Sequence, residues 1–326
     1  MKNLLALFVA LASVSAFSAE ISRDIVIYGS SPAAISAAVQ AKRMGKSAVV
    51  VSPETRIGGL TTGGLGQTDI GNKAAFGGIA LEFYKAVAAH YADSANWKWQ
   101  KPESYFPDAR RAELFKAHLD YQRGLMWTLA NHPRIPEKIR SAISKWGMCK
   151  DEFKDGPGDG WQSQLYVREA RRMVGDYVMT EHECRGDRKV SRPVAMGAYT
   201  MDSHHVRRVV TAKGDVQNEG DVQDGARYSA WGKNAGKRGR MRPYGIDYGA
   251  IVPKKGECTN LFVPVCLSAS HMAFGSIRME PVFFALGQAA GTAGALSIDA
   301  SCAVQDLPYG KLERALLLDG QVLRLK

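Results

Sequence analysis

Hydrophobic and polar positions near the N-terminus predict a strand, a tight turn, a helix and a second strand. Ile25 to Tyr28 is a short apolar run of the kind that a buried parallel strand shows, and Gly29 follows it directly. Small residues crowd the next segment up to Gly45, where we expect the helix to end. Ser47 to Val51 is rich in valine and supplies the second strand. The segment therefore reads as a β-α-β unit.

The rest of the chain shows mostly helical spacing of its apolar residues. Residues 190–222 alternate short β-like runs with turns, and Asn260 to Cys266 is apolar enough for another strand. Pro281 suits the first position of a helix. The predicted helices span about 79–91, 108–130, 137–146, 165–179, 282–296 and 311–318. A β-α-β start followed by helices and short strands predicts an α/β fold.

The first 18 residues have the pattern of a secretory signal peptide. Lys2 gives a short basic start, Leu4 to Leu11 is apolar, and small residues follow up to Ala19. Cleavage after Ala16 or after Ser18 both fit this pattern. The apolar run is too short to anchor the chain across a membrane. We therefore expect a secreted or periplasmic protein.

Composition and charge narrow the class of protein. The chain has 326 residues, 45% of them hydrophobic, which indicates a globular protein. Its formal charge is +11, but predicted export argues against nucleic acid as a partner. Part of the charge falls in residues 233–242, either a solvated loop or a patch for anionic polysaccharide or a membrane surface.

The number and spacing of the cysteines limit which metal sites and disulfides the chain can form. Their number is odd and none forms a C-x-x-C pair, so neither a metal site nor a dense disulfide framework is predicted. One or two disulfides stay open. The cysteines are Cys149, Cys184, Cys258, Cys266 and Cys302.

The turn after the first strand resembles a dinucleotide-binding fingerprint. Against G-x-G-x-x-G/A the chain has Ser31 in place of the second glycine and Ala34 at the third position. The acidic residue expected ~20 positions on is Glu54, two residues beyond the strand end at Ser52. Such a turn directs helix N-terminal amides at a pyrophosphate, although it also occurs as a plain α/β turn.

Two further segments have a composition that suits the lining of a cofactor site. Residues 56–71 combine many glycines with threonines, so that their backbone can press against a flat or phosphorylated ligand. In 282–296 small residues recur every three or four positions, which suits close packing on a cofactor or on a neighbouring helix. Gln288, Thr292 and three glycines favour a core helix, so we predict no integral membrane span.

Four ordered blocks, residues 56–69, 165–177, 201–204 and 266–282, extend along nearly the whole mature chain. They resemble the secreted FAD-dependent oxidoreductase family of the glutathione-reductase-like flavoprotein superfamily. The resemblance implies a Rossmann-like FAD-binding domain, three-layered with a mostly parallel sheet, and a second helical and β-rich region. Members of the family are longer, and the jump from Trp99 to Pro102 resembles an internal deletion. The FAD-binding domain would then be incomplete.

The resemblance also implies a division of the chain and a set of FAD contacts. Residues 1–18 are the signal peptide, 19–99 and 251–326 are the two parts of the FAD-binding domain, and 100–250 form a substrate or cap region. Arg278 and Glu280 are expected near the isoalloxazine. The expected cofactor-binding residues are Gly29, Ser31, Pro32, Ala33, Glu54, Gly58, Gly59, Leu60, Thr61, Arg278, Glu280, Gly287, Gln288, Gly291 and Thr292.

Histidines are the candidate catalytic residues. A histidine near flavin takes a hydroxyl proton while hydride leaves the adjacent carbon, and His204 and His271 are the candidates. His205 would face away from His204 if the segment is extended. We predict an oxidoreductase acting on a small molecule or carbohydrate, with an unknown electron acceptor. The alternatives are a non-catalytic remnant or binding protein of the family, and a polysaccharide lyase.

Overall fold

The computed structural model describes residues 20–52, 54, 56–63, 65, 68–92, 109–148, 160–161, 166–168, 171–204, 207–219 and 242–325. The predicted signal peptide, the jump from Trp99 to Pro102 and all but the last residue of the basic segment 233–242 lie outside the described residues. Cys149 and His205 lie outside them too.

The N-terminal β-α-β unit is confirmed. Strand β1 (Ile25–Tyr28) and strand β2 (Ala48–Val51) pair in parallel, and helix α1 (Pro32–Arg43) connects them. The Ser31 side chain caps α1 by accepting a hydrogen bond from the Ala34 amide. Gly45 has a φ of 74°, the left-handed conformation that ends many helices.

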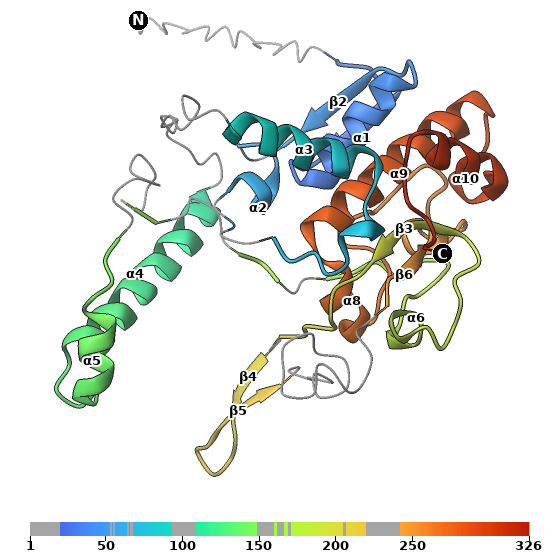
Figure 1. The fold of residues 1–326 in the computed structure, drawn as a ribbon. Helices are drawn as coiled ribbons and strands as arrows, with labels where there is room; N and C mark the ends of the chain where they lie inside the picture. Colours follow the sequence, from blue (N-terminus) through green and yellow to red (C-terminus); the bar gives the residue numbers. More distant parts are fainter. Residues whose placement is uncertain are drawn as a thin grey trace, which may run out of the picture.

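Helix α9 (Glu280–Asp299) is the centre of the molecule (Figure 1). It is long and apolar enough to cross a membrane, but 83% of its most apolar window is buried inside the protein, which supports the core interpretation. Helix α1 lies along one side of it, and helix α3 (Gly78–Ala92) packs on another. Helix α10 (Tyr309–Leu318) covers a further side.

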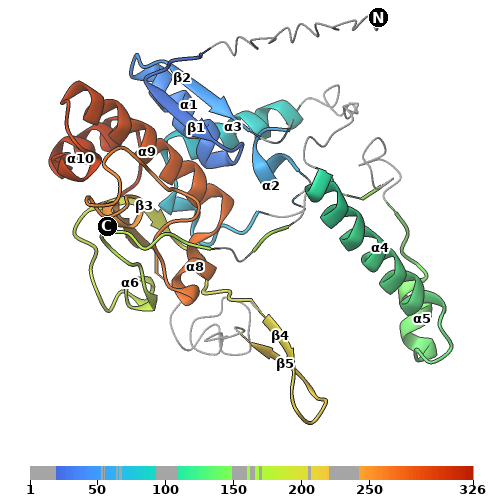
Figure 2. The ribbon, with the colours of Figure 1, turned by 180° about the vertical axis from the view of Figure 1, so that it is seen from behind.

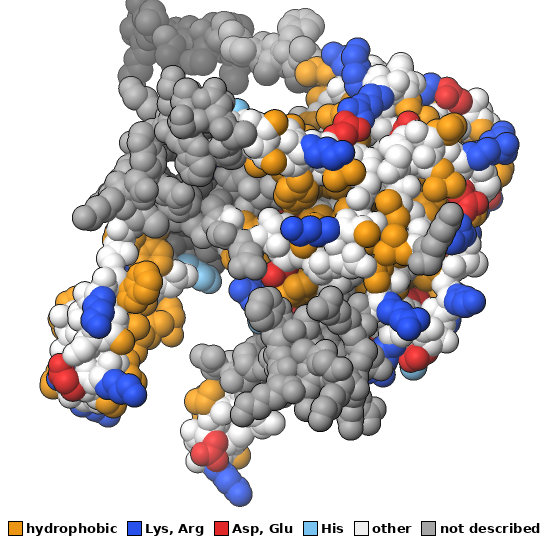
Figure 3. Space-filling model, in the orientation of Figure 1, with side chains coloured by type: hydrophobic (Ala, Val, Ile, Leu, Met, Phe, Trp, Pro, Cys, Tyr) orange, Lys and Arg blue, Asp and Glu red, His pale blue; other side chains and the backbone are white. Residues whose placement is uncertain are grey.

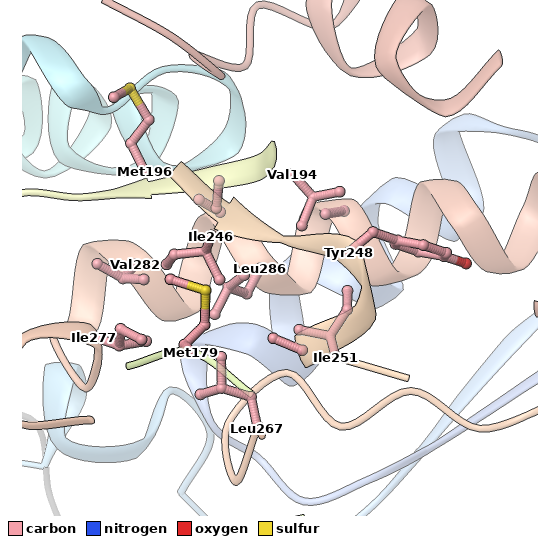
Figure 4. Close-up of a cluster of buried hydrophobic side chains, with 14 of the residues drawn as sticks. Met179, Val194, Met196, Ile246, Tyr248, Ile251, Leu267, Ile277, Val282 and Leu286 are labelled. Atoms are coloured by element: carbon pink, nitrogen blue, oxygen red, sulfur yellow. The ribbon is translucent and has the colours of Figure 1, made fainter. Parts of the chain in front are cut away.

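A second part of the core lies between α9 and an antiparallel pair of strands. Strand β3 (Pro193–Gly197) pairs with strand β6 (Tyr244–Asp247), with a register shift between Pro193 and Ala195. Figure 4 shows apolar side chains from these strands meeting those of α9 and its neighbours. Two short helices, α6 (Glu181–Arg185) and α8 (His271–Ile277), close this part of the core.

Other elements project from the body or lie on its surface. Helix α4 (Ala109–Asn131) and helix α5 (Glu137–Ile143) pack on each other as an arm that extends away from α9 (Figures 1 and 2). Strands β4 (Arg207–Val210) and β5 (Val216–Glu219) form an antiparallel hairpin. The remaining short helices are α2 (Gly59–Thr62), η1 (Lys73–Ala75), η3 (Tyr248–Ala250) and η4 (Val304–Asp306).

Two predicted elements are wrong. The predicted helix 165–179 is not helical in its described residues, which run extended beside residues 249–268. The Met173 amide donates to the Cys266 carbonyl at 2.9 Å, and the Met179 amide donates to the Ser268 carbonyl at 3.0 Å. The predicted strand 260–266 is irregular. Its backbone forms single hydrogen bonds with separate segments: the Cys266 carbonyl accepts from the Met173 amide, and the Val263 amide donates to the Ile251 carbonyl. Helix α5 also ends at Ile143, before the predicted Trp146.

The predicted mostly parallel sheet is not seen in the described residues. They form three two-stranded sheets, of which only β1–β2 is parallel. Helix α1 covers one face of this pair (Figure 2), and the apolar side chains on the other face are exposed. Val26 is 65% exposed, Tyr28 80% and Val51 47%. The mixed α/β character is present, but this parallel sheet is covered on one face only.

The described cysteines are all thiols. Cys184, Cys258, Cys266 and Cys302 form no disulfide with one another. Within the same described residues, no group of three or more His, Cys, Asp or Glu side chains is placed to hold a metal ion.

Candidate functional site

The turn between β1 and α1 is the candidate phosphate-binding turn of the sequence. Gly29 has a φ of 109°, and its amide donates to the Val51 carbonyl at 2.7 Å. A side chain at Gly29 would be strained, yet no atom lies within 4 Å of the place of its Cβ. The turn is therefore open on its outer side, where the N-terminus of α1 and its partial positive charge are directed.

Glu54 reaches the same turn although it is displaced from the usual position. The Ser30 hydroxyl donates to Glu54 Oε2 at 3.1 Å, and Ser30 itself is only 4% exposed. The acidic group at the end of β2 is thereby held beside the fingerprint turn. Ser30 was not predicted as a site residue, since the fingerprint leaves its position free.

The glycine-rich segment meets the same turn through α2. The Gly58 amide donates to the Ser30 carbonyl at 2.6 Å. Gly58 and Gly59 have φ values of 99° and 56°, so both occupy the left-handed region that favours glycine. A Cβ added to Gly59 would lie 3.2 Å from the Pro32 ring. The N-termini of α1 and α2 are thus in close contact.

Thr61 joins α2 to the N-terminus of α9. Its hydroxyl donates to Glu280 Oε2 at 2.5 Å. Burial raises the pKa of the Glu280 carboxyl, and the hydrogen bonds from Thr61 offset part of that rise. Residues from Gly29 to Glu280, far apart in sequence, therefore form one continuous wall.

A cavity of about 210 Å³ lies at the end of this wall, beside the N-terminus of α9. Its lining combines an apolar surface with four charged side chains. The lining residues are Leu60, Leu65, Asp69, Tyr166, Val167, Arg168, Val265, Cys266, Phe274, Arg278, Met279, Glu280 and Phe283. Predicted residues Leu60, Arg278 and Glu280 are among them.

A polar network stands behind the cavity wall. Arg278 Nη2 donates to the backbone carbonyl of Asp202 at 2.9 Å and lies 3.2 Å from its Oδ2. The Nε2 atom of His204 is 3.0 Å from the same Oδ2. Arg168 Nη1 is 2.7 Å from that ring nitrogen. His204 thus lies between a carboxylate and a guanidinium, one side chain away from the cavity.

Asp202 was not among the predicted site residues. The block of residues 201–204 signalled it, because an acid two positions before a histidine lies on the same side of an extended chain. Nearby, burial raises the pKa of Tyr199 to about 12, and the adjacent Asp69 carboxylate adds to that effect. His271, the other predicted catalytic residue, begins α8 and does not line the cavity.

Four predicted cofactor residues have a packing role in the structure. A Cβ on Gly287 would lie 2.1 Å from the Ala33 carbonyl oxygen, and one on Gly291 would lie 2.7 Å from the Ala37 carbonyl oxygen. Gln288 accepts a hydrogen bond from the Ile79 amide at 2.9 Å, and the Thr292 hydroxyl donates to the Gln288 carbonyl. These contacts join α9 to α1 and α3, while direct contact with a cofactor stays a prediction.

These residues fit FAD. The open turn at Gly29 is suited to the pyrophosphate and Glu54 to a ribose hydroxyl, while the cavity at the N-terminus of α9 is suited to the ring system. A β-α-β unit with such a turn is typical of dinucleotide-binding proteins. The model of the family described as FAD dependent oxidoreductase matches residues 24–116 and 95–316. The chain belongs to this family, and its cofactor is FAD.

Comparison with individual proteins adds little. No curated protein matches the chain. A solved structure of a putrescine oxidase double mutant with redesigned cofactor binding is similar at 15% identity, over 40% of this chain and 34% of that chain, with a TM-score of 0.14. The aligned part therefore spans about a third of that protein, and at this TM-score nothing about the fold is inferred from it.

Proposed function

We propose that this protein oxidises a small molecule, a carbohydrate or polyol, by hydride transfer from a carbon that bears a hydroxyl group. The observation that carries the proposal is the continuous wall from the β1–α1 turn through Thr61 to Glu280, which ends in a cavity with an apolar lining and four charged side chains. When bound, FAD supplies the hydride acceptor. The electrons then pass to an acceptor outside this chain.

The chain's own residues supply the proton chemistry. In the proposed reaction Nε2–H of His204 is donated to Asp202 and the lone pair on Nδ1 takes the hydroxyl proton of the substrate. This requires Arg168, whose Nη1 lies 2.7 Å from Nε2, to move aside so that the ring reaches the cavity. Asp202 fixes the orientation of the ring. Arg278 in turn fixes Asp202, and its side chain is only 6% exposed. The test for this role is His204→Gln, which should lower kcat while FAD binding is retained.

The chain is also proposed to be exported and shortened relative to its family. The signal-like start supports export to the periplasm or the medium. Two overlapping matches to the family model, 24–116 and 95–316, support a discontinuity near Trp99. The uncovered face of β1–β2 supports missing parts of the FAD-binding domain. We propose that 19–99 and 251–326 build this domain together, in line with the packing of α1 on α9.

The visible spectrum of the purified mature chain tests the proposal. Bound oxidised flavin absorbs near ~450 nm, a property of the cofactor's own ring system. We expect a yellow protein, or one that turns yellow when refolded with FAD. A protein that stays colourless in both cases would contradict the proposal that this chain is an FAD-dependent oxidoreductase.

One observation favours a second function, a non-catalytic binding protein of the same family. Val26, Tyr28 and Val51 are exposed, so in the described part of the chain helix α1 covers one face of the parallel pair and the other face is open. A colourless protein that still binds carbohydrate would support this function. Formation of an unsaturated sugar from acidic polysaccharide would instead support a lyase.

A further inference from the structure

Arg168 contributes a positive charge to the cavity without an acidic partner among the described residues. The residue is exposed and lines the cavity. Its guanidinium lies 4.6 Å from the centroid of the Tyr166 ring and 2.7 Å from His204 Nε2. Neither of these partners carries a negative charge, and no described carboxylate forms an ion pair with Arg168. An arginine of this kind keeps its donors available for an anion.

The acids around the cavity are already engaged by donors of the protein. Glu280 accepts from Thr61, and Asp69 is hydrogen-bonded by the Tyr199 hydroxyl. Asp202 is shared by Arg278 and His204. The charge of Asp202 is thus balanced by Arg278, while Asp69 and Glu280 each accept from a neutral hydroxyl group. Arg168 is the arginine of the cavity lining that has no acidic partner among the described residues.

Two more arginines add positive character to the same wall. Arg278 is buried, and its Nε has no hydrogen-bond partner in the described part of the chain. Arg172 lies with its guanidinium 5.0 Å from the centroid of the Phe274 ring, which itself lines the cavity. The charge of Arg278 is balanced by Asp202, and Arg172 is not among the lining residues, so Arg168 is the guanidinium that a ligand in the cavity reaches.

We propose that the exposed end of the cavity, where Arg168 lies, binds a substrate that carries a carboxylate, while the buried end beside α9 is left to the ring system of FAD. Arg168 is the residue that recognises the carboxylate. A guanidinium matches the two oxygens of a carboxylate with two parallel hydrogen bonds. A carboxylate bound there draws the guanidinium away from His204 and leaves that ring bonded to Asp202. The inference rests on the proposed function for its role in the reaction, and it narrows the substrate to acidic carbohydrates such as sugar acids.

Calorimetric titration of a matched pair of sugars tests this inference. D-galacturonate and D-galactose differ only in the carboxylate, and each is titrated into the purified full mature chain with FAD added. We expect D-galacturonate to bind roughly 10–100-fold more tightly, the range that one charge-assisted hydrogen-bonded contact provides. Arg168→Gln should remove the difference, and Arg168→Lys should retain part of it.

The control variant is Arg314→Gln, which changes an exposed arginine on α10 and should leave both affinities unchanged. Thermal melting confirms that all variants are folded. Equal binding of the two sugars by the native protein, or no binding of D-galacturonate, would overturn the inference.

A different result would assign Arg168 to the cofactor. If Arg168→Gln weakens FAD binding, followed by the flavin absorbance, and leaves D-galacturonate binding unchanged, the arginine serves the pyrophosphate and the inference is wrong. If the native chain holds no FAD, the proposed oxidation fails, while the sugar titration still decides whether the cavity recognises a carboxylate.

Discussion

Gly287 marks the closest approach of α9 to α1. A Cβ there would lie 2.1 Å from the Ala33 carbonyl oxygen and 2.3 Å from the Ser36 hydroxyl, and the backbone of α1 cannot give way. Gly287→Ala should lower the free energy of unfolding by about 1–3 kcal/mol, as overpacking of a core does. Urea unfolding measures the change.

Gly310 in α10 provides the matched control. No atom lies within 4 Å of the place of its Cβ, so Gly310→Ala should leave the stability unchanged or raise it by up to about 1 kcal/mol. Equal losses in the two variants would show that close helix contact is not what requires Gly287.

Glu183 makes a contribution to the stability of the protein that is lost at acid pH. Burial alone would raise the pKa of its carboxyl, but hydrogen bonds from Arg188, Tyr177 and Thr180 outweigh burial and lower the pKa to about 2. The folded form thus holds the proton less tightly than the unfolded chain. The contribution of Glu183 is present in full above the usual glutamate pKa and is lost as the pH falls toward about 2.

The expected result is a native protein that loses stability between about pH 5 and pH 2, and a Glu183→Gln variant with a flatter profile. The variant should be less stable than the native protein at pH 7 by roughly 1–3 kcal/mol, the cost of weakened buried hydrogen bonds. Urea unfolding at a series of pH values follows both. Parallel profiles would contradict the assignment.

Glu280 should behave in the opposite way. Burial raises the pKa of this carboxyl, so its ionised form is disfavoured in the folded protein, and stability falls as the pH rises through the folded pKa. Glu280→Gln keeps an acceptor for Thr61 without the buried charge. We expect this variant to be at least as stable as the native protein at pH 7. A large loss at pH 7 would show that the ionised carboxylate is needed.

Some residue roles were readable from the sequence and others were not. Gly29, Glu54 and Thr61 do lie along one wall, because a β-α-β turn and a glycine-rich loop have few ways to fold. Gly287 and Gly291 were expected against a cofactor, but they lie against α1. A missing side chain serves helix packing and ligand contact alike, so their spacing cannot distinguish the two.

The elements of the chain differ in how well local pattern predicted them. Helices α1 and α9 have strong end signals and a clear apolar composition, and both were placed within a few residues. The segment before Met179 has valines at helical spacing, yet Val174 is 63% exposed and the backbone pairs with residues 249–268. The helical spacing of apolar residues does not report such long-range backbone pairing, which decides the conformation of this segment.

The exposed face of β1–β2 gives a prediction for that element. Tyr28 is 80% exposed, so Tyr28→Thr should change the free energy of unfolding by no more than about 0.5 kcal/mol. The variant should bind less of a fluorescent apolar dye and should aggregate less, because exposed apolar strands promote association. Unchanged dye binding would mean that this face is covered in solution.

At the scale of the whole molecule, the sequence indicated the family and its cofactor but not the arrangement of sheets. The expected three-layer parallel sheet was inferred from the resemblance, whereas the described strands form three separate pairs. The number of strands in a sheet depends on segments that join it from elsewhere in the chain. No pattern within residues 25–51 reports whether those partners are present.

Proposed export gives a prediction for the mature chain. The N-terminal sequence of the protein recovered from the periplasm or the medium should begin at Phe17 or Ala19, which follow the two predicted cleavage points. Recovery of the protein with Met1 intact and only in the cytoplasm would exclude the signal peptide. The same fraction should contain the flavin absorbance if the cofactor is inserted.

The contact of α1 with α9 has a consequence for how the protein folds. The Ser36 hydroxyl donates to the Phe284 carbonyl at 2.8 Å, and these residues are 248 positions apart. Contacts of such separation form slowly, since a long loop must close before any stabilisation is gained. Among the described helices α1 is the first to be synthesised, and its small-residue face stays unburied until α9, near the C-terminal end, has been made. A chaperone that shields the region around α1 would act in that interval, and premature chain termination before α9 would leave a product unable to fold.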